Sequence, residues 1–231
     1  MWVWSDPLAI ETLIESLPSL FDGLVVTILL TALSIVLGTV LGILLATGRS
    51  YAVRPVAYLI LIYEKVLRGI PLLVLFFLIY FGLPQIGINM NAFTASVIGL
   101  GLRSSAYQAQ IYRGAINSIP EGQIHAAFSL GMNKLKAIHH VIIPQMLRLS
   151  IPGWSNEFTI LLKDTSLAFG IGVIELMRQG RYIQVRDPDS VLAVFLLIAV
   201  IYFILVFSAN KILSYVEKKY QMTGYQAEAH R

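Results

Sequence analysis

Four charged side chains interrupt apolar stretches of this sequence and are the residues best placed to do chemistry. Arg103 stands alone in one stretch, whereas Glu157, Lys163 and Asp164 share another. A charge at membrane depth costs about 3 kcal/mol, so such side chains usually face the protein interior or a water-filled path. A carboxylate and a guanidinium in such a place could bind the ammonium and carboxylate ends of a zwitterionic solute.

Helical spacing places these side chains on different faces. Glu157 and Asp164 lie two helical turns apart on one face, whereas Lys163 lies about 240° around the helix from Glu157. We predict that Asn156, Glu157, Asp164 and Arg103 line a substrate path, in which a negative Glu157 would favour cationic or zwitterionic solutes. Two structural alternatives stay open. Lys163 and Asp164 could pair with other helices, and Arg103 could bond to a carboxylate or to carbonyls inside the bundle.

Catalytic chemistry has little support in the sequence. Cysteine is absent, and the histidines include one adjacent pair, His139 and His140, without metal-ligand spacing. The closeness of Ser166 to Lys163 is a coincidence of spacing rather than a hydrolase signature. No segment matches G-x-x-x-x-G-K-[ST], the loop that cradles nucleotide phosphates. We therefore predict that the chain is not an enzyme, has no metal site, and binds neither ATP nor another cofactor.

The composition places the chain in a membrane. Of its 231 residues 57% are hydrophobic and 13% are charged, whereas soluble domains usually carry about 25% charged residues. Its net charge of +4 sits in short clusters between apolar runs, which argues against a nucleic-acid surface. We predict a single all-α transmembrane domain over residues 1–231, located in the cell membrane.

The uncharged runs predict five membrane spans. Gly23–Gly48 and Ser190–Asn210 are each long enough to cross about 30 Å of hydrocarbon. Gly69–Leu102 is too long for one span and is divided by the turn-rich stretch Gly82–Gly87. The spans are expected at roughly 23–48, 58–82, 92–113, 150–176 and 190–213.

Lysine and arginine predict the orientation of these spans. With the N-terminus outside the cell, twelve basic residues fall on the cytoplasmic side and three fall outside. This asymmetry predicts an outside N-terminus and a cytoplasmic C-terminus. The twelve are Arg49, Arg54, Lys65, Arg68, Arg113, Lys134, Lys136, Arg148, Lys211, Lys218, Lys219 and Arg231, and the three are Arg178, Arg181 and Arg186.

Small residues mark one face of the first span. Ser34, Gly38, Gly42 and Ala46 follow one another at four-residue spacing, so they form one stripe on a helix. Such a stripe lets another helix approach closely. The partner is either a helix of the same chain, which we favour, or a second subunit.

Residues 114–147 form the longest charged segment outside the spans. Ser118 to Glu121 has the pattern of a capping box with proline in the first turn, and it predicts a helix that ends at Gly131. Asn133 is suited to cap a second helix, which Pro144 would kink or close. We expect two short helices joined by a glycine corner on the cytoplasmic side.

This segment resembles the E-A-A-x-x-x-G…I-x-L-P loop of ABC importer permeases. His125 to Gly131 and the following Pro144 carry the resemblance. In that family the loop forms a coupling helix that docks in a groove of a cytoplasmic ATPase. The resemblance implies that His125, Ala126, Ala127, Leu130 and Gly131 contact the ATPase. His125 stands where the family usually has glutamate.

Three further stretches resemble the polar amino-acid branch of the same family. They are Arg68–Val74, Ala106–Gly114 and Asn156–Leu167, with Gln110 where relatives often carry glutamate. Together with the loop they extend the resemblance over residues 15–220.

The resemblance implies a transport function and a set of partners. The chain would form half of the translocation path of an ATP-driven, binding-protein-dependent importer of polar amino acids. The partners would be a cytoplasmic ABC ATPase dimer that binds ATP and Mg, a second permease subunit (a copy or a homologue), and an extracytoplasmic substrate-binding protein. The alternative is an ion-coupled secondary transporter or a channel for small polar solutes, although no clear inverted repeat is present.

Overall fold

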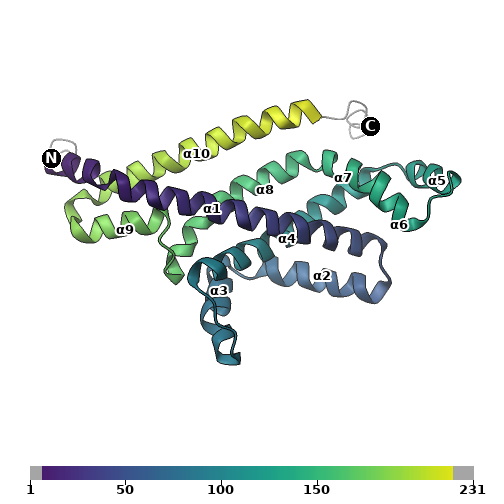
Figure 1. The fold of residues 1–231 in the computed structure, drawn as a ribbon, viewed down its shortest axis with the longest axis horizontal. Coiled ribbons are helices and arrows are strands. Elements are labelled where there is room, and N and C mark those ends of the chain that lie inside the picture. Colours follow the sequence, from purple (N-terminus) through teal and green to yellow (C-terminus); the bar gives the residue numbers. More distant parts are fainter. Residues whose placement is uncertain (1–6, 221–231) are drawn as a thin grey trace.

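The computed structural model describes residues 7–220, and the elements in this range are helical. Figure 1 shows an elongated bundle in which α1 lies at the centre and α5 and α6 form one end. The α-helices are α1 (Pro7–Tyr51), α2 (Arg54–Gly69), α3 (Leu72–Phe77), α4 (Ala92–Ser118), α5 (Glu121–Ser129), α6 (Lys134–Ala137), α7 (Ile143–Leu149), α8 (Ile151–Asp164), α9 (Leu176–Arg186) and α10 (Val191–Tyr220). Between them lie the π-helical turns η2 (Leu78–Gly82) and η4 (Ile138–Ile142), and the 3₁₀ turns η3 (Leu83–Ile86), η5 (Thr165–Ile171) and η6 (Pro188–Ser190).

The prediction of an all-helical membrane protein is confirmed. Within the described residues, α1 and α10 are long and apolar enough to cross a bilayer, and α2 with the segment Leu72–Ile86 forms a bent pair that meets the same test together. The predicted span 92–113 lies within α4. The predicted span 150–176 is interrupted, because α8 ends at Asp164 and continues as the 3₁₀ turn η5. The number of spans and their orientation remain predictions.

The second predicted span, 58–82, is wrong as a single helix. The chain bends by 106° between α2 and the segment Leu72–Ile86. Ile70 adopts an extended conformation, with φ −85° and ψ 129°. Pro71 follows it, lacks an amide hydrogen and disfavours helical geometry in the preceding residue, so the helix cannot continue. The turn expected at Gly82–Gly87 is largely 3₁₀-helical and ends at Gly87, whose φ is +84°.

The small-residue stripe of α1 packs against α4 of the same chain, as favoured. A Cβ on Gly38 would come within 2.8 Å of the Gln108 Nε2 and 3.0 Å of the Ser104 Cβ, and a Cβ on Gly42 would come within 3.2 Å of the Tyr112 ring. Ser34 and Ala46 are also fully buried. The stripe is therefore used within the chain and is not free to form a dimer face.

We expect Gly38→Val to destabilise the folded chain. The added side chain would collide with Gln108 and Ser104, and overpacking of this kind typically costs about 1–3 kcal/mol. Gly114→Val is the matched control, because Gly114 also lies in a helix but has open space where a Cβ would be. Thermal unfolding of the two variants in detergent checks this. An equal melting temperature for both would contradict the packing described.

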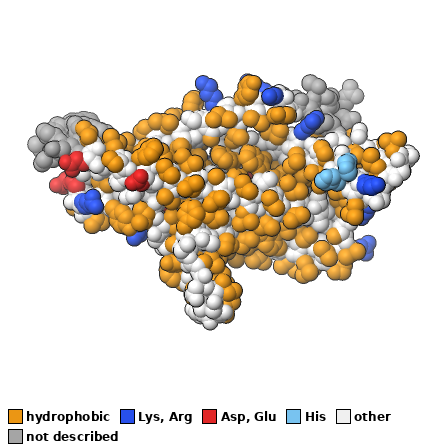
Figure 2. Space-filling view, viewed as in Figure 1, with side chains coloured by type: hydrophobic (Ala, Val, Ile, Leu, Met, Phe, Trp, Pro, Cys, Tyr) orange, Lys and Arg blue, Asp and Glu red, His pale blue; other side chains and the backbone are white. Residues whose placement is uncertain are grey.

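The surface is consistent with a lipid environment. Apolar side chains dominate the middle of the face shown in Figure 2, while acidic side chains gather near α9 and the N-terminal end. Histidines and several basic side chains gather at the opposite end, near α5 and α6. Arg231, which entered the charge asymmetry, lies outside the described residues.

Candidate functional site

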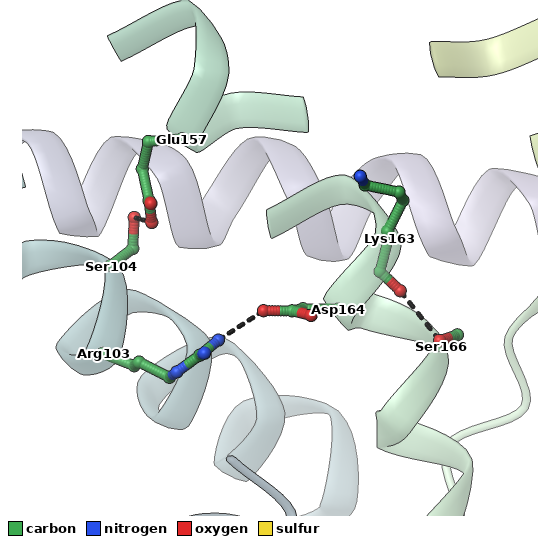
Figure 3. Close-up of polar contacts among 6 residues, drawn as sticks. All are labelled: Arg103, Ser104, Glu157, Lys163, Asp164 and Ser166. Carbon is green, nitrogen blue, oxygen red and sulfur yellow. Dashed lines mark hydrogen bonds and ion pairs between the residues drawn. The ribbon is translucent and has the colours of Figure 1, made fainter. Parts of the chain in front are cut away.

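An ion pair joins α4 to the end of α8 near the middle of the molecule. The Arg103 guanidinium donates a hydrogen bond from Nη1 to Oδ2 of Asp164, as Figure 3 shows. Both side chains are about a quarter exposed, at 24% and 25%. The pair agrees with the structural alternative for Arg103, which expected a carboxylate partner within the bundle. Part of each side chain therefore stays exposed at the surface of the chain.

Tyr107 brings a second arginine to this site. The guanidinium carbons of Arg103 and Arg68 lie 5.3 Å and 5.2 Å from the centre of the Tyr107 ring. Arg68 is in the last turn of α2, and Tyr107 is one turn after Arg103 on α4. Cations at this distance from a tyrosine ring are attracted to its π-face. The site therefore contains two guanidinium groups, one carboxylate and an aromatic ring.

Glu157 lies inside the bundle rather than on its surface. Its side chain is 6% exposed and accepts a hydrogen bond of 2.7 Å from Ser104 Oγ (Figure 3). Gln108 Nε2 donates to Ser104 Oγ over 3.1 Å, while Thr39 and Tyr112 hydroxyls donate to Gln108 Oε1. A continuous buried polar network thus connects α1, α4 and α8, and buried polar groups in such a network fix the packing of the helices.

Two further polar residues of the same sequence stretch, Asn156 and Lys163, are exposed. Asn156 is exposed on α8, one position before Glu157. Lys163 is also exposed, and Figure 3 shows its amine directed away from the Arg103–Asp164 pair. The Ser166 hydroxyl donates to the Lys163 backbone carbonyl and not to its amine, so the two side chains do not form a catalytic pair.

Three residues of this region were not identified as site residues from the sequence. Tyr107, Ser104 and Gln108 all lie on α4, and Tyr107 and Gln108 were noted only within a family motif. A signal was present, because Arg103 and Tyr107 are four residues apart, as are Ser104 and Gln108. Residues with this spacing share a helix face. These two pairs give a mostly apolar helix two adjacent polar faces. Such a pattern indicates that the helix makes polar contacts with two other parts of the structure.

The segment 114–147 forms the expected two helices and corner. Helix α5 ends in a Schellman motif, in which the Gly131 amide donates to the Phe128 carbonyl and the Met132 amide donates to the Ala127 carbonyl. Gly131 has φ +77°, a conformation that favours glycine. The Asn133 side chain accepts a hydrogen bond from the Lys136 amide and caps α6, as predicted.

Two details of this segment differ from the sequence prediction. The capping box is absent, because Ser118 is the last residue of α4 and its hydroxyl donates to the Ala115 carbonyl. Pro120 occupies the N-cap of α5 instead, without a side-chain hydrogen bond. Of the two roles predicted for Pro144, kinking or closing the second helix, closing is wrong, because the π-helical turn η4 leads directly into α7, which contains Pro144. A π-turn widens the hydrogen-bond spacing and so accommodates the missing proline amide.

The corner presents an exposed surface at one end of the bundle. His125, Ala126 and Gly131 are exposed, Leu130 is 79% exposed, and Ala127 is buried. Phe128 of α5 and Leu135 of α6 are also exposed, at 44% and 77%, and several exposed large apolar residues in one region are typical of a protein-binding surface. Lys134 connects this region to the bundle, since its Nζ donates to the carbonyl of Tyr51 at the end of α1 over 2.7 Å. The corner is therefore tied to the longest helix of the molecule.

Comparisons with known proteins agree with this architecture. Residues 38–222 match the family of binding-protein-dependent transport system inner membrane components. The L-cystine transport system permease protein TcyB of Bacillus subtilis (strain 168) is 38% identical over 202 residues, which are 87% of this chain and 86% of the relative. The glutamine transport system permease protein GlnP of Escherichia coli (strain K12) is 34% identical over 206 residues, which are 88% and 94%.

Solved structures extend the agreement to the fold. A crystal structure of an amino acid ABC transporter with histidines matches with a TM-score of 0.80 and 37% identity, over 90% of this chain and 96% of that one. An inward-facing structure of the MetNI methionine ABC transporter matches with a TM-score of 0.63 at 19% identity, which shows a shared fold. The chain therefore belongs to the family of binding-protein-dependent transport system inner membrane components, as a cell-membrane permease subunit of an amino-acid ABC importer.

Proposed function

We propose that this chain forms half of the path by which an ATP-driven importer takes up polar amino acids. The observation that carries the proposal is the exposed corner Ala126–Gly131, held by its Schellman motif and tied to α1 through Lys134. A separate ABC ATPase, which binds ATP and Mg, docks on His125, Ala126, Ala127, Leu130 and Gly131. Residues 114–147 would then transmit the closing motion of the ATPase to the bundle.

The other partners follow from the same proposal. A substrate-binding protein delivers the amino acid on the extracytoplasmic side, and a second permease subunit supplies the other half of the path. The N-terminus lies outside and the C-terminus lies in the cytoplasm, in agreement with the basic residues near α5 and α6. Relatives with this architecture include proteins described as permeases for L-cystine and for glutamine, which supports a polar amino acid as the substrate.

The polar site supplies groups for both charged ends of an amino acid. The partly exposed Arg103 and Arg68 around Tyr107 suit the substrate carboxylate, and Asp164 suits its ammonium group. Asn156, exposed on the adjacent helix α8, adds an uncharged hydrogen-bonding group. Arg103 balances the charge of Asp164, whereas Glu157 is hydrogen-bonded by a hydroxyl. The charge of Glu157 offsets that of Arg68, and close to Glu157 it would favour the cationic side chain of arginine, lysine or histidine.

Reconstitution tests the proposal directly. The chain is purified together with its candidate ATPase and placed in liposomes with the substrate-binding protein. Uptake of radiolabelled amino acid should require ATP and stop when the catalytic glutamate of the ATPase is replaced by glutamine. Uptake that follows an ion gradient without ATP would instead identify an ion-coupled transporter.

Glu157→Gln tests the preference for cationic substrates. We expect arginine uptake to fall about tenfold, because losing about 1.4 kcal/mol of attraction between the Glu157 charge and a cationic substrate corresponds to that factor. Glutamine uptake should change by less than about twofold, since that substrate has no net charge. The amide keeps an acceptor for Ser104, so folding should be preserved. Competition between the two amino acids in proteoliposomes checks this, and an equal loss for both would remove the cationic preference.

A further inference from the structure

A cavity of about 260 Å³ separates the C-terminal half of α10 from the rest of the bundle. Leu213 and Val216 of α10 form one wall, and residues of α1, α4, α7 and α8, including Leu147 and Trp154, form the other. The buried residues of α10 all lie at or before Ile198. Figure 1 shows α10 along one edge of the bundle, with its C-terminal half beside α8 and α7. This half of the helix is therefore only loosely packed.

The cavity lies at the cytoplasmic ends of the predicted spans. Tyr112, Ser150 and Leu213 line it, and each is at, or next to, the end of its span that the proposed orientation places in the cytoplasmic leaflet. Thr39 marks the deep end. It lies nine residues before Gly48, which is about 14 Å along the helix. The cavity thus extends through most of the hydrocarbon of one leaflet, which is about 15 Å thick.

The lining favours an apolar occupant. Trp154 Nε1 donates to Thr39 Oγ1 over 3.0 Å, and the Thr39 and Tyr112 hydroxyls donate to the buried network of α4. The Ser150 hydroxyl donates to a backbone carbonyl over 2.9 Å. Ser155 Oγ has no hydrogen-bond partner within residues 7–220, and it suits a single acceptor such as an ester carbonyl. A buried water needs roughly two to four polar partners, so this lining suits an alkyl chain better.

The cytoplasmic mouth of the cavity carries unpaired cations. Arg148 is exposed at the end of α7, next to the lining. On α10, Tyr220 lies one turn after Val216 on the same face, and the Lys219 ammonium is 5.7 Å from the centre of its ring. Within residues 7–220 neither Arg148 nor Lys219 forms an ion pair. Glu217 adds one negative charge nearby, so the mouth stays basic. Figure 2 shows Lys or Arg side chains near the C-terminal end of α10.

We propose that this cavity binds an anionic phospholipid of the cytoplasmic leaflet. One acyl chain fills the space between α10 and α8, and the phosphate meets Arg148 and Lys219. Basic pockets between transmembrane helices on the cytoplasmic side suit such headgroups. A second copy related by a two-fold axis would bring the same cations to this mouth, and like charges oppose that contact. The inference rests on the orientation given under the proposed function.

Trp154 provides a probe inside the cavity, because bromine on an acyl chain quenches a tryptophan that it contacts. The full-length chain carries Trp2→Phe and Trp4→Phe, which leaves Trp154 as its one tryptophan. It is reconstituted in equimolar phosphatidylglycerol and phosphatidylcholine with matched chains, and one lipid or the other is brominated. Brominated phosphatidylglycerol should quench Trp154 at least about threefold more than brominated phosphatidylcholine, because the basic mouth attracts the anion.

Moving the probe gives the first control. Trp154→Phe with Phe203→Trp places the tryptophan on an outer face of α10, since Phe203 is 68% exposed. The two brominated lipids should quench this variant equally, as expected for lipid that exchanges freely around the protein. Size-exclusion chromatography checks that each variant is folded.

Charge variants give the second control. Arg148→Gln with Lys219→Gln should abolish the preference of Trp154 for phosphatidylglycerol. Lys211→Gln with Lys218→Gln removes the same number of charges from the face of α10 opposite Leu213 and should leave the preference intact.

The other outcomes overturn the inference. Equal quenching of Trp154 by both lipids means that the cavity does not select a headgroup, and no quenching by either means that protein covers it. A preference that survives loss of Arg148 and Lys219 removes the headgroup site. ATP-dependent uptake by the unmodified importer is measured in the same lipids. If uptake is present without selective quenching, the lipid inference fails alone, and if uptake is absent the proposed function fails.

Discussion

Replacing Gly131 by valine is expected to abolish ATP-driven uptake while the chain remains folded in the membrane. The φ of +77° at Gly131 is strongly unfavourable for a β-branched residue, with a cost of about 1–2 kcal/mol. The strain falls on the two hydrogen bonds of the Schellman motif, so the corner should open and redirect α6 relative to α5. We expect uptake and substrate-stimulated ATP hydrolysis to fall at least tenfold.

Gly131→Asn is the matched control, because asparagine tolerates the left-handed conformation better than other residues with a side chain. It adds a polar group of similar size at the same place and should retain most of the uptake. Size-exclusion chromatography and uptake in proteoliposomes are measured for both variants. If valine and asparagine reduce uptake equally, the backbone conformation at this corner does not matter for coupling. If valine retains full uptake, the docking role of the corner is contradicted.

Breaking the Arg103–Asp164 pair is expected to have the second large effect. Asp164→Asn leaves the Arg103 guanidinium without its carboxylate partner, next to the guanidinium of Arg68 on the same Tyr107 ring. An unpaired charge at membrane depth costs about 3 kcal/mol. We expect a clear fall in melting temperature and in the yield of folded protein. Differential scanning fluorimetry in detergent measures the first, and fluorescence-detected size exclusion measures the second.

The double variant Arg103→Gln with Asp164→Asn separates stability from transport. It removes both charges, so it should recover most of the stability lost in Asp164→Asn. In a double-mutant cycle the effects of the two substitutions on the free energy of unfolding would then be non-additive. Uptake should remain low in the double variant, because both groups proposed to bind the amino acid are gone. Recovery of uptake together with stability would show that the pair holds the bundle and does not bind substrate. Equal stability of single and double variants would contradict the ion pair itself.

Much of the fold could be predicted from uncharged runs and small residues. The run Gly23–Gly48 lies within α1, and Ser190–Asn210 lies almost entirely within α10, because both are long enough to impose one helical element. The glycine stripe of α1 correctly indicated a close helix partner. Periodicity did not predict the bend after Gly69, because an apolar run shows where lipid or core contacts lie and does not show the direction of the chain. The local signal for the bend was Pro71, which disfavours helical geometry in the preceding Ile70.

The candidate site was less predictable than the fold. Intramembrane charge identified Arg103, Glu157 and Asp164, but spacing on one helix could not show that Asp164 meets Arg103 while Glu157 meets Ser104. Those pairings depend on how α8 crosses α4, which is a tertiary feature. The capping box at Ser118 was also wrong, because the preceding helix α4 extends through that serine. Local motifs predicted the corner at Gly131 better, since a Schellman motif depends on the few residues around it.

The packing of α1 on α4 has a consequence for biosynthesis. The groove formed by Gly38 and Gly42 is filled by Ser104, Gln108 and Tyr112, which the ribosome makes long after α1 is complete. The first helix therefore stays in the bilayer with this groove unfilled until nearly half of the chain has been translated. A chain whose synthesis stops before Tyr112 lacks the side chain that fills this groove. It would be a substrate for membrane quality-control proteases.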